Sequence, residues 1–355
     1  MPGMIEGHAH TMEGTLWRNV YVGWFDRMDP DGKVWDGVKS IEGVLDRLSE
    51  AEAKMTDADT PLSGWSLDPI YMDNQRVSRQ DLDKVSTTRP IGVLHASGHI
   101  LNVNSKALEQ AGLLKPGVNH PGIPLGDDGM PTGELYGPDA MTPVAGFVGY
   151  DRAMTDCDER GLLDYAKLCV RAGVTTSTDL AARLTDDSVS MMLDVTARNR
   201  FPLRVVPLRI FFGMSAEECV EYTKALKEQS TDLLRLGRIK AVADGSIQGF
   251  SARMRWPGYH NGAPNGLWYT APDQMSELYN RALAAGIQVH THTNGDQATQ
   301  MALDVFEFAE VLPLSICLSL TALLKAWDEL AGEARERGMS PMKRLEQLWR
   351  LGGAV

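Results

Sequence analysis

Cysteine is scarce in this sequence of 355 residues, and no CxxC pair occurs. The four cysteines lie far apart, at Cys157, Cys169, Cys219 and Cys317. A disulfide framework and a thiolate zinc site both need closely spaced cysteines, so the spacing argues against both. We therefore expect inert, partly buried thiols in a reducing compartment.

Excess positive charge and long apolar runs are also missing. Lys and Arg number 35 against 47 Asp and Glu, which gives a formal net charge of −12. Nucleic-acid binding and membrane-surface binding both favour a basic face, so we expect neither. The longest apolar run, residues 311–324, contains a proline and two serines and is shorter than the roughly 20 residues of a spanning helix. Because the N-terminus also lacks a basic segment followed by an apolar one, we expect a cytoplasmic protein.

The second half of the chain alternates between helical and strand patterns. Helix ends are expected at Gly173 and Gly286, and Thr270 is a plausible cap for the helix after it. We expect helices over about residues 162–172, 186–198, 215–228 and 272–285 and from 296, and strands at 174–179, 203–210, 239–244 and 287–292. Such alternation predicts βαβ crossovers and a parallel sheet. Polar residues gather at the strand ends and no GxGxxG or P-loop motif occurs, which favours a (β/α) barrel over a doubly wound sheet.

Two segments interrupt this rhythm. Residues 4–8 predict a first strand, but residues of about 20–150 look like a long insertion. Within it we expect a helix at 41–54, a short strand at 91–95, a helix entered between His99 and Leu108, and a loop at 119–131. Residues 311–355 predict a separate tail of two amphipathic helices, the second starting at Ser340-Pro341. The prediction is therefore a barrel portion over residues 1–310, with its insertion, and a helical tail.

Two His-x-His pairs are the clearest chemical signal. His8 and His10 follow the first predicted strand, and His290 and His292 end a later one. In an extended chain, residues i and i+2 share a face, so both imidazoles of a pair can reach one metal ion. Two such pairs at strand ends indicate that at least one histidine of each pair binds metal.

Other polar residues near strand ends have competing interpretations. Lys240 lies in an apolar strand, where it is either an exposed edge residue or a buried ammonium that needs a partner. Asp244 either orients a ligand or starts a turn with Gly245. His95 and His99 either touch substrate or are hydrogen-bonded loop histidines.

These residues together resemble the metal-dependent amidohydrolase superfamily and, within it, the YtcJ-like amidohydrolase family 3. The likeness covers about residues 1–310 and runs through five ordered stretches, Pro2–His10, Gly98–Leu108, Gly173–Thr176, Lys240–Gly249 and His290–Ala298. The resemblance implies an α/β fold, a TIM-like (β/α)8 barrel, with a divalent metal centre at the mouth. It implies hydrolysis of carbon–nitrogen bonds in small amides or cyclic amides, by metal-activated water.

The resemblance also assigns site residues. His8, His10, Lys240 and His292 match the ligands of one or two divalent ions, with zinc favoured, and the lysine matches one that many relatives carboxylate. His99 and Asp244 match positions near the substrate. The family's general-base aspartate has no counterpart, so no catalytic residue is assigned.

Departures from the family pattern predict an incomplete barrel of strands one to five. The family has a segment ahead of Pro2–His10 that this chain does not show, and no histidine follows His292. Leu312–Leu320 stands where the family carries its sixth-strand histidine, and Asp328 lies in the tail. The alternative to an enzyme is thus an inactive truncated fragment, or one part of a larger assembly. Homo-oligomerisation is left open.

Overall fold

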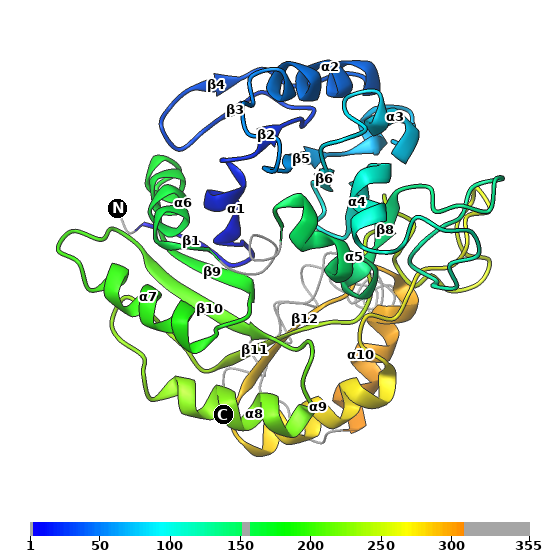
Figure 1. Cartoon of the computed structure of the whole chain (residues 1–355). Helices are drawn as coiled ribbons and strands as arrows, with labels where there is room; N and C mark the ends of the chain where they lie inside the picture. The colour runs from blue at the N-terminus through cyan, green and yellow to red at the C-terminus, as the bar shows by residue number, and fades with distance from the viewer. Residues whose placement is uncertain (1–2, 151–156, 309–355) are drawn as a thin grey trace, which may run out of the picture.

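A parallel sheet carries the second half of the chain. The computed structural model describes residues 3–150 and 157–308, which form two five-stranded sheets with helices around them (Figure 1). The first sheet has the order β1-β9-β10-β11-β12, and every neighbouring pair in it is parallel. Its strands are β1 (Met4–Glu6), β9 (Val174–Ala182), β10 (Arg204–Ile210), β11 (Arg238–Val242) and β12 (Gln288–His292). The predicted α/β class with a parallel sheet is therefore confirmed.

Helices connect these strands and cover the outer face of the sheet (Figure 1). They are α6 (Glu159–Arg171), α7 (Asp186–Thr196), α8 (Ala216–Lys227), α9 (Pro272–Ala284) and α10 (Asp296–Phe308). Side chains of Asp158, Thr185 and Ser215 accept hydrogen bonds from the first turns of α6, α7 and α8, which satisfies backbone N–H groups that a helix start leaves without partners. Gly173 adopts φ +75° after α6, a backbone conformation that favours glycine.

The apolar stripes of these helices pack against the sheet in two clusters. One joins α6 and α7 to β9 and β10, through residues such as Leu162, Met192 and Val205. The other joins α8, α9 and α10 to β11 and β12, through residues such as Met275 and Ile239. Cys169 and Cys219 are buried there, as expected for inert thiols.

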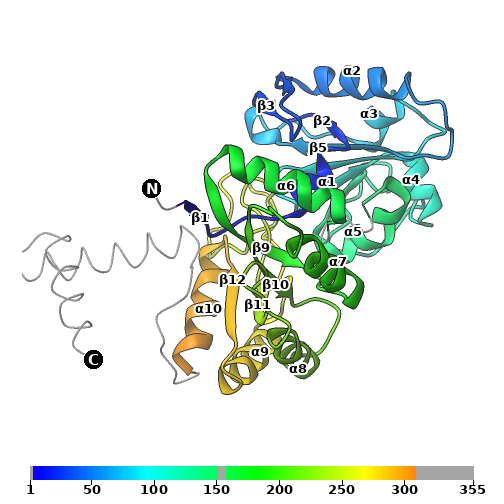
Figure 2. The ribbon, with the colours of Figure 1, turned by 90° about the vertical axis from the view of Figure 1, so that its left-hand side faces the viewer.

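Residues 20–150 form a second, mixed sheet of their own, stacked beside one end of the parallel sheet (Figures 1 and 2). Its order is β2-β5-β6-β7-β8; β2, β5 and β6 pair in parallel, and β6, β7 and β8 pair antiparallel. The strands are β2 (Val20–Tyr21), β5 (Leu62–Leu67), β6 (Ile91–His95), β7 (Ile100–Val103) and β8 (Glu134–Tyr136), with a separate hairpin of β3 (Arg27–Met28) and β4 (Val34–Trp35).

Short helices cover this second sheet. They are α2 (Ile41–Glu52), α3 (Arg79–Asp83), α4 (Ser105–Gln110) and α5 (Gly137–Ala145), with α1 (Met12–Leu16) leading in from β1 and 3-10 turns at Pro69–Tyr71 and Gly146–Val148. One element of the prediction is wrong. The segment after His99 is first a strand, β7, and the helix begins only at Ser105, because Asn104 caps it and Ile100–Val103 is β-prone and pairs with β6.

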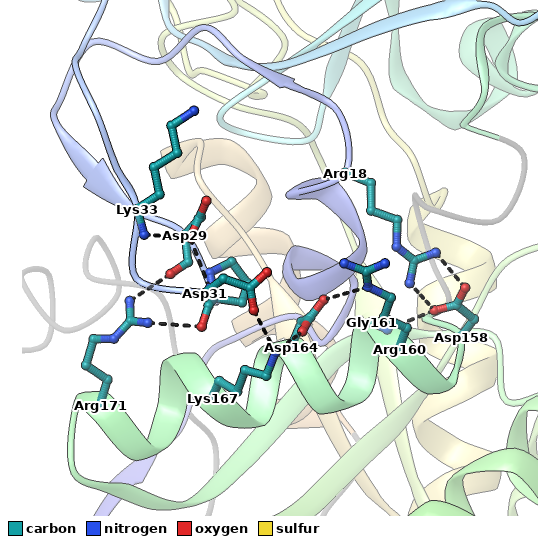
Figure 3. Close-up of polar contacts among 11 residues, drawn as sticks. Arg18, Asp29, Asp31, Lys33, Asp158, Arg160, Gly161, Asp164, Lys167 and Arg171 are labelled. Atoms are coloured by element: carbon teal, nitrogen blue, oxygen red, sulfur yellow. Dashed lines mark hydrogen bonds and ion pairs between the residues drawn. The ribbon is translucent and has the colours of Figure 1, made fainter.

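The insertion is fastened to α6 by polar contacts (Figure 3). The Lys167 ammonium lies 2.9 Å from the Asp31 carboxylate beside the β3–β4 hairpin. The Arg171 guanidinium donates to the Asp29 carbonyl at 2.9 Å. Arg18, just ahead of the insertion, donates at 2.6 Å to Asp158, the cap residue of α6. Exposed ion pairs of this kind contribute little each, so they fix orientation more than they stabilise.

Two further expectations need comment. Thr270 does not cap α9; Ala271 is the cap residue, and the Thr270 hydroxyl instead donates to the Val242 carbonyl at 2.8 Å. The predicted tail, 311–355, lies outside the described residues, and the division into barrel portion and tail stays a prediction. Across the described ranges, no helix is both long and apolar enough to cross a membrane.

Candidate metal centre

Five histidines from distant parts of the chain meet at one end of the parallel sheet. His8 and His10 follow β1, His290 and His292 lie on β12, and His99 precedes β7 of the insertion. The ring centroids of His8 and His290 are 5.5 Å apart, although β1 and β12 are the first and last strands in the sheet order. The sheet is therefore curved enough to bring its two outer strands face to face across its concave side.

The rings form two touching groups. The His8 ring centroid lies 5.8 Å from that of His10 and 5.5 Å from that of His290, both in edge-on contacts. The His99 centroid lies 4.8 Å from that of His292 and 5.6 Å from that of Tyr269. The insertion thus contributes one imidazole to the centre, and Tyr269 is a neighbour that no sequence signal indicated.

Lys240 lies at the middle of this cluster. It is 2% exposed, so the buried interpretation of this lysine is the correct one, and its Cα is the register partner of His290. Burial is the larger cause, and the Lys240 charge a further one, of a lowered pKa at all five imidazoles. The pKa falls to about 3 for His10 and His290 and to about 4 for His99. At neutral pH these rings are therefore uncharged, which is the state that binds metal ions.

The histidine ring nitrogens of this centre differ in whether they have hydrogen-bond partners. Among the described residues, the rings of His8, His10 and His290 have no hydrogen-bond partner, and the His10 Nδ1 atom is buried without one. His292 Nε2 lies 3.2 Å from the Gly245 carbonyl oxygen. The Asn294 side-chain amide nitrogen lies 3.1 Å from the same Nε2 atom. Because a carbonyl oxygen accepts and an amide N–H donates, these two contacts hold the Nε2 edge of the ring and are compatible with either tautomer.

A buried aspartate lies behind His10. The Asp179 Oδ1 atom is 4.0 Å from His10 Nδ1, and Asp179 is 3% exposed. Its carboxylate accepts from the Thr11 hydroxyl and from the Ala181 backbone N–H. Carboxylates in this place commonly orient a metal-binding imidazole. The sequence had indicated Asp179 only as the end of a strand, and β9 in fact continues to Ala182.

Asp244, by contrast, is engaged by the backbone. It is fully buried, and its two oxygens accept from the backbone N–H groups of Asn294, Arg253 and Gly295 at 2.8–2.9 Å. Burial raises the pKa of this carboxyl to about 6, against the opposing effect of those hydrogen bonds. It ties the loops after β11 and β12 together, and its predicted contact with substrate stays a prediction.

His95 is a structural residue. It is 4% exposed and its Nε2 lies 2.6 Å from the Asn102 side-chain oxygen inside the second sheet. This is the hydrogen-bonded alternative that the sequence left open, although the residue lies in a strand and not in a loop.

The donor set fits a divalent metal ion in its chemistry: uncharged imidazoles with available nitrogens, a buried lysine and a nearby carboxylate. As the side chains stand, however, no three His, Cys, Asp or Glu residues of the described ranges converge closely enough to hold one ion together. Loading therefore requires rotation of the rings, which are not restrained by hydrogen bonds at His8, His10 and His290.

Comparison with known proteins gives a consistent result. Residues 1–313 match the family model described as "Amidohydrolase family". The chain is 26% identical to Protein LONG AFTER FAR-RED 3 of Arabidopsis thaliana, over 86% of this chain and 51% of that protein. It is also 26% identical to the putative amidohydrolase YtcJ of Bacillus subtilis, over 76% of this chain and 52% of that protein. The chain thus spans about half the length of these curated relatives.

Solved structures share the fold. An uncharacterized metal-dependent hydrolase from Pyrococcus horikoshii matches with a TM-score of 0.55 at 17% identity, covering 87% of this chain and 56% of that one. A second, from Pyrococcus furiosus, matches with a TM-score of 0.52 at 21% identity, covering 87% and 58%. With a family model matched over residues 1–313, the chain belongs to the amidohydrolase family.

Proposed function

We propose that this chain is a metal-dependent hydrolase acting on carbon–nitrogen bonds of small amides or cyclic amides. The observation that carries the proposal is the meeting of five uncharged imidazoles around one buried lysine, from β1, β11, β12 and the insertion. A structural core seldom gathers so many polar rings, because burying them without partners costs free energy.

We interpret the parallel sheet as five strands of a (β/α)8 barrel. Its strands are linked by helices on the outer face, and the histidines lie at the ends where the strands finish, which is where barrel enzymes carry their chemistry. The insertion overlies that same end and brings His99 to the centre.

His8, His10, Lys240 and His292 are the proposed holders of one or two divalent ions, zinc being favoured. A bound ion supplies Lewis acidity toward a carbonyl and makes water a better nucleophile at neutral pH. The protein's own part is to present uncharged imidazoles, to hold the His292 ring through Gly245 and Asn294, and to orient His10 through Asp179. His99, whose ring lies beside that of Tyr269, is the proposed contact to the substrate.

Lys240 is the proposed site of carboxylation. The ammonium would first lose one proton, and the resulting amine would then add carbon dioxide and release a second proton. The carbamate formed in this way replaces a positive charge by a negative one. In a pocket of uncharged imidazoles, that change would convert a repulsive group into an oxygen ligand for a cation.

The test is zinc binding and hydrolysis by the full chain. Purified protein loaded with zinc should retain the metal after dialysis and hydrolyse some members of a panel of amides, ureas and cyclic imides. His292→Ala should lose metal and activity, whereas His260→Ala, an exposed loop histidine, should not. A parent chain that retains no metal would contradict the proposal and favour a non-catalytic fragment.

A further inference from the structure

We propose that His290 is an additional ligand of this metal centre and completes a three-imidazole group with His8 and His10. The inference rests on the proposed function and extends it, because the family resemblance assigns only His292 from this strand.

The first argument for His290 as a ligand is its position on β12. His290 and His292 are two residues apart on β12, so their side chains share the concave face, while Val289 and Thr291 are buried on the other. His290 is the register partner of Lys240, and its ring touches that of His8, which in turn touches that of His10. His8 is thus the central ring of three.

The second argument is that the three imidazole rings have nitrogens available for a ligand. Within residues 3–150 and 157–308, the rings of His8, His10 and His290 form no hydrogen bond. A histidine retained for structure is normally hydrogen-bonded, as His95 is to Asn102. Three adjacent rings with available nitrogens are instead what a metal ion needs, and each ring can turn about two side-chain torsions.

His292 belongs to the other group. Its ring is nearest to His99, and its Nε2 lies close to both the Gly245 carbonyl and the Asn294 side-chain amide. The two histidines of β12 therefore contact different neighbours, His290 the first-strand pair and His292 the His99 ring of the insertion. The structure assigns them separate places, which makes their roles separable by experiment.

The decisive variants are His290→Ala and His290→Gln, compared with the parent and with His260→Ala. Each protein is titrated with zinc against a chromophoric chelator, and metal content is measured after dialysis. Loss of a ligand should weaken zinc binding by at least as much as loss of an outer-shell partner, about tenfold or more. Cobalt-loaded parent and His290→Gln should also differ in their visible absorption, since the ligand set changes.

Footprinting of the unmutated chain covers the case in which both variants fail to fold. Diethylpyrocarbonate modifies uncharged imidazoles, and mass spectrometry locates the adducts. Zinc should protect His290 and leave His260 equally modified. Equal modification of His290 with and without zinc, or zinc affinity in folded His290→Gln equal to the parent's, would overturn the inference while leaving the proposed function intact. A parent that binds no zinc would overturn both.

Discussion

Acid should destabilise this protein partly through a single histidine of the insertion. Burial, with the nearby Arg76 charge, lowers the pKa of His95 from 6.5 to about 3. A group whose pKa is depressed on folding in this way stays uncharged in the folded protein while the unfolded chain takes up a proton. Its contribution to stability is therefore complete above pH 6.5 and is lost as the pH falls from there toward about 3.

At pH values well above the folded pKa of His95, the size of this effect on the free energy of unfolding depends only on the pKa of the histidine in the unfolded chain. At a pH of about 5.5, one unit below 6.5, protonation of the unfolded histidine favours unfolding by about 1.4 kcal/mol. At a pH of about 7.5 the same effect is below roughly 0.1 kcal/mol. One residue should therefore change the unfolding equilibrium about tenfold between the two conditions.

The His95→Gln variant isolates the contribution of His95 to the pH dependence of stability, because glutamine does not titrate and can still donate a hydrogen bond to Asn102. Urea unfolding of parent and variant at both pH values gives a double difference, in which the contributions of Asp244, the histidines of the candidate metal centre and every other group cancel. The parent should lose about 1.4 kcal/mol more than the variant on acidification. An equal loss in both proteins would refute the reasoning and would mean that His95 can be protonated in the folded state.

Three further predictions test other parts of the structure. Asp179→Asn should weaken zinc binding about 10–100-fold, because the carboxylate is expected to orient His10. The thermal unfolding of the zinc-free protein should stay nearly unchanged. Unchanged affinity in a zinc titration would contradict this prediction. Asp244→Ala should lower the free energy of unfolding by about 3 kcal/mol or more, since three backbone N–H groups lose their acceptor; urea unfolding equal to the parent's would show that water replaces it. Leu48→Ala, at a fully buried position of α2, should lower the free energy of unfolding by about 2–5 kcal/mol in the same urea assay. Leu125→Ala, at an exposed position, should lower it little. Similar losses at both sites would argue against the packing described for the insertion.

Local pattern was enough for much of the fold. The helices and strands from α6 to α10 were predicted with both ends within a few residues of those in the structure. Apolar periodicity and helix stops such as Gly173 depend only on residues close together in the sequence, so the sequence reveals them. The strand β7 was missed because its assignment depends on pairing with β6, and Thr270 was misassigned because its hydroxyl bonds to a strand far back in the chain.

The candidate site divides in the same way. The sequence alone determined the family, the two His-x-His pairs and the strand that carries Lys240, since each is a short-range pattern. Only the tertiary structure decided that Lys240 is buried among five imidazoles, that Asp179 stands behind His10, and that His290 rather than His292 faces the first-strand pair. Most of these contacts join residues far apart in the chain, such as His10 and Asp179 or His8 and His290. The curvature of the sheet, together with the way the insertion lies over its end, sets them.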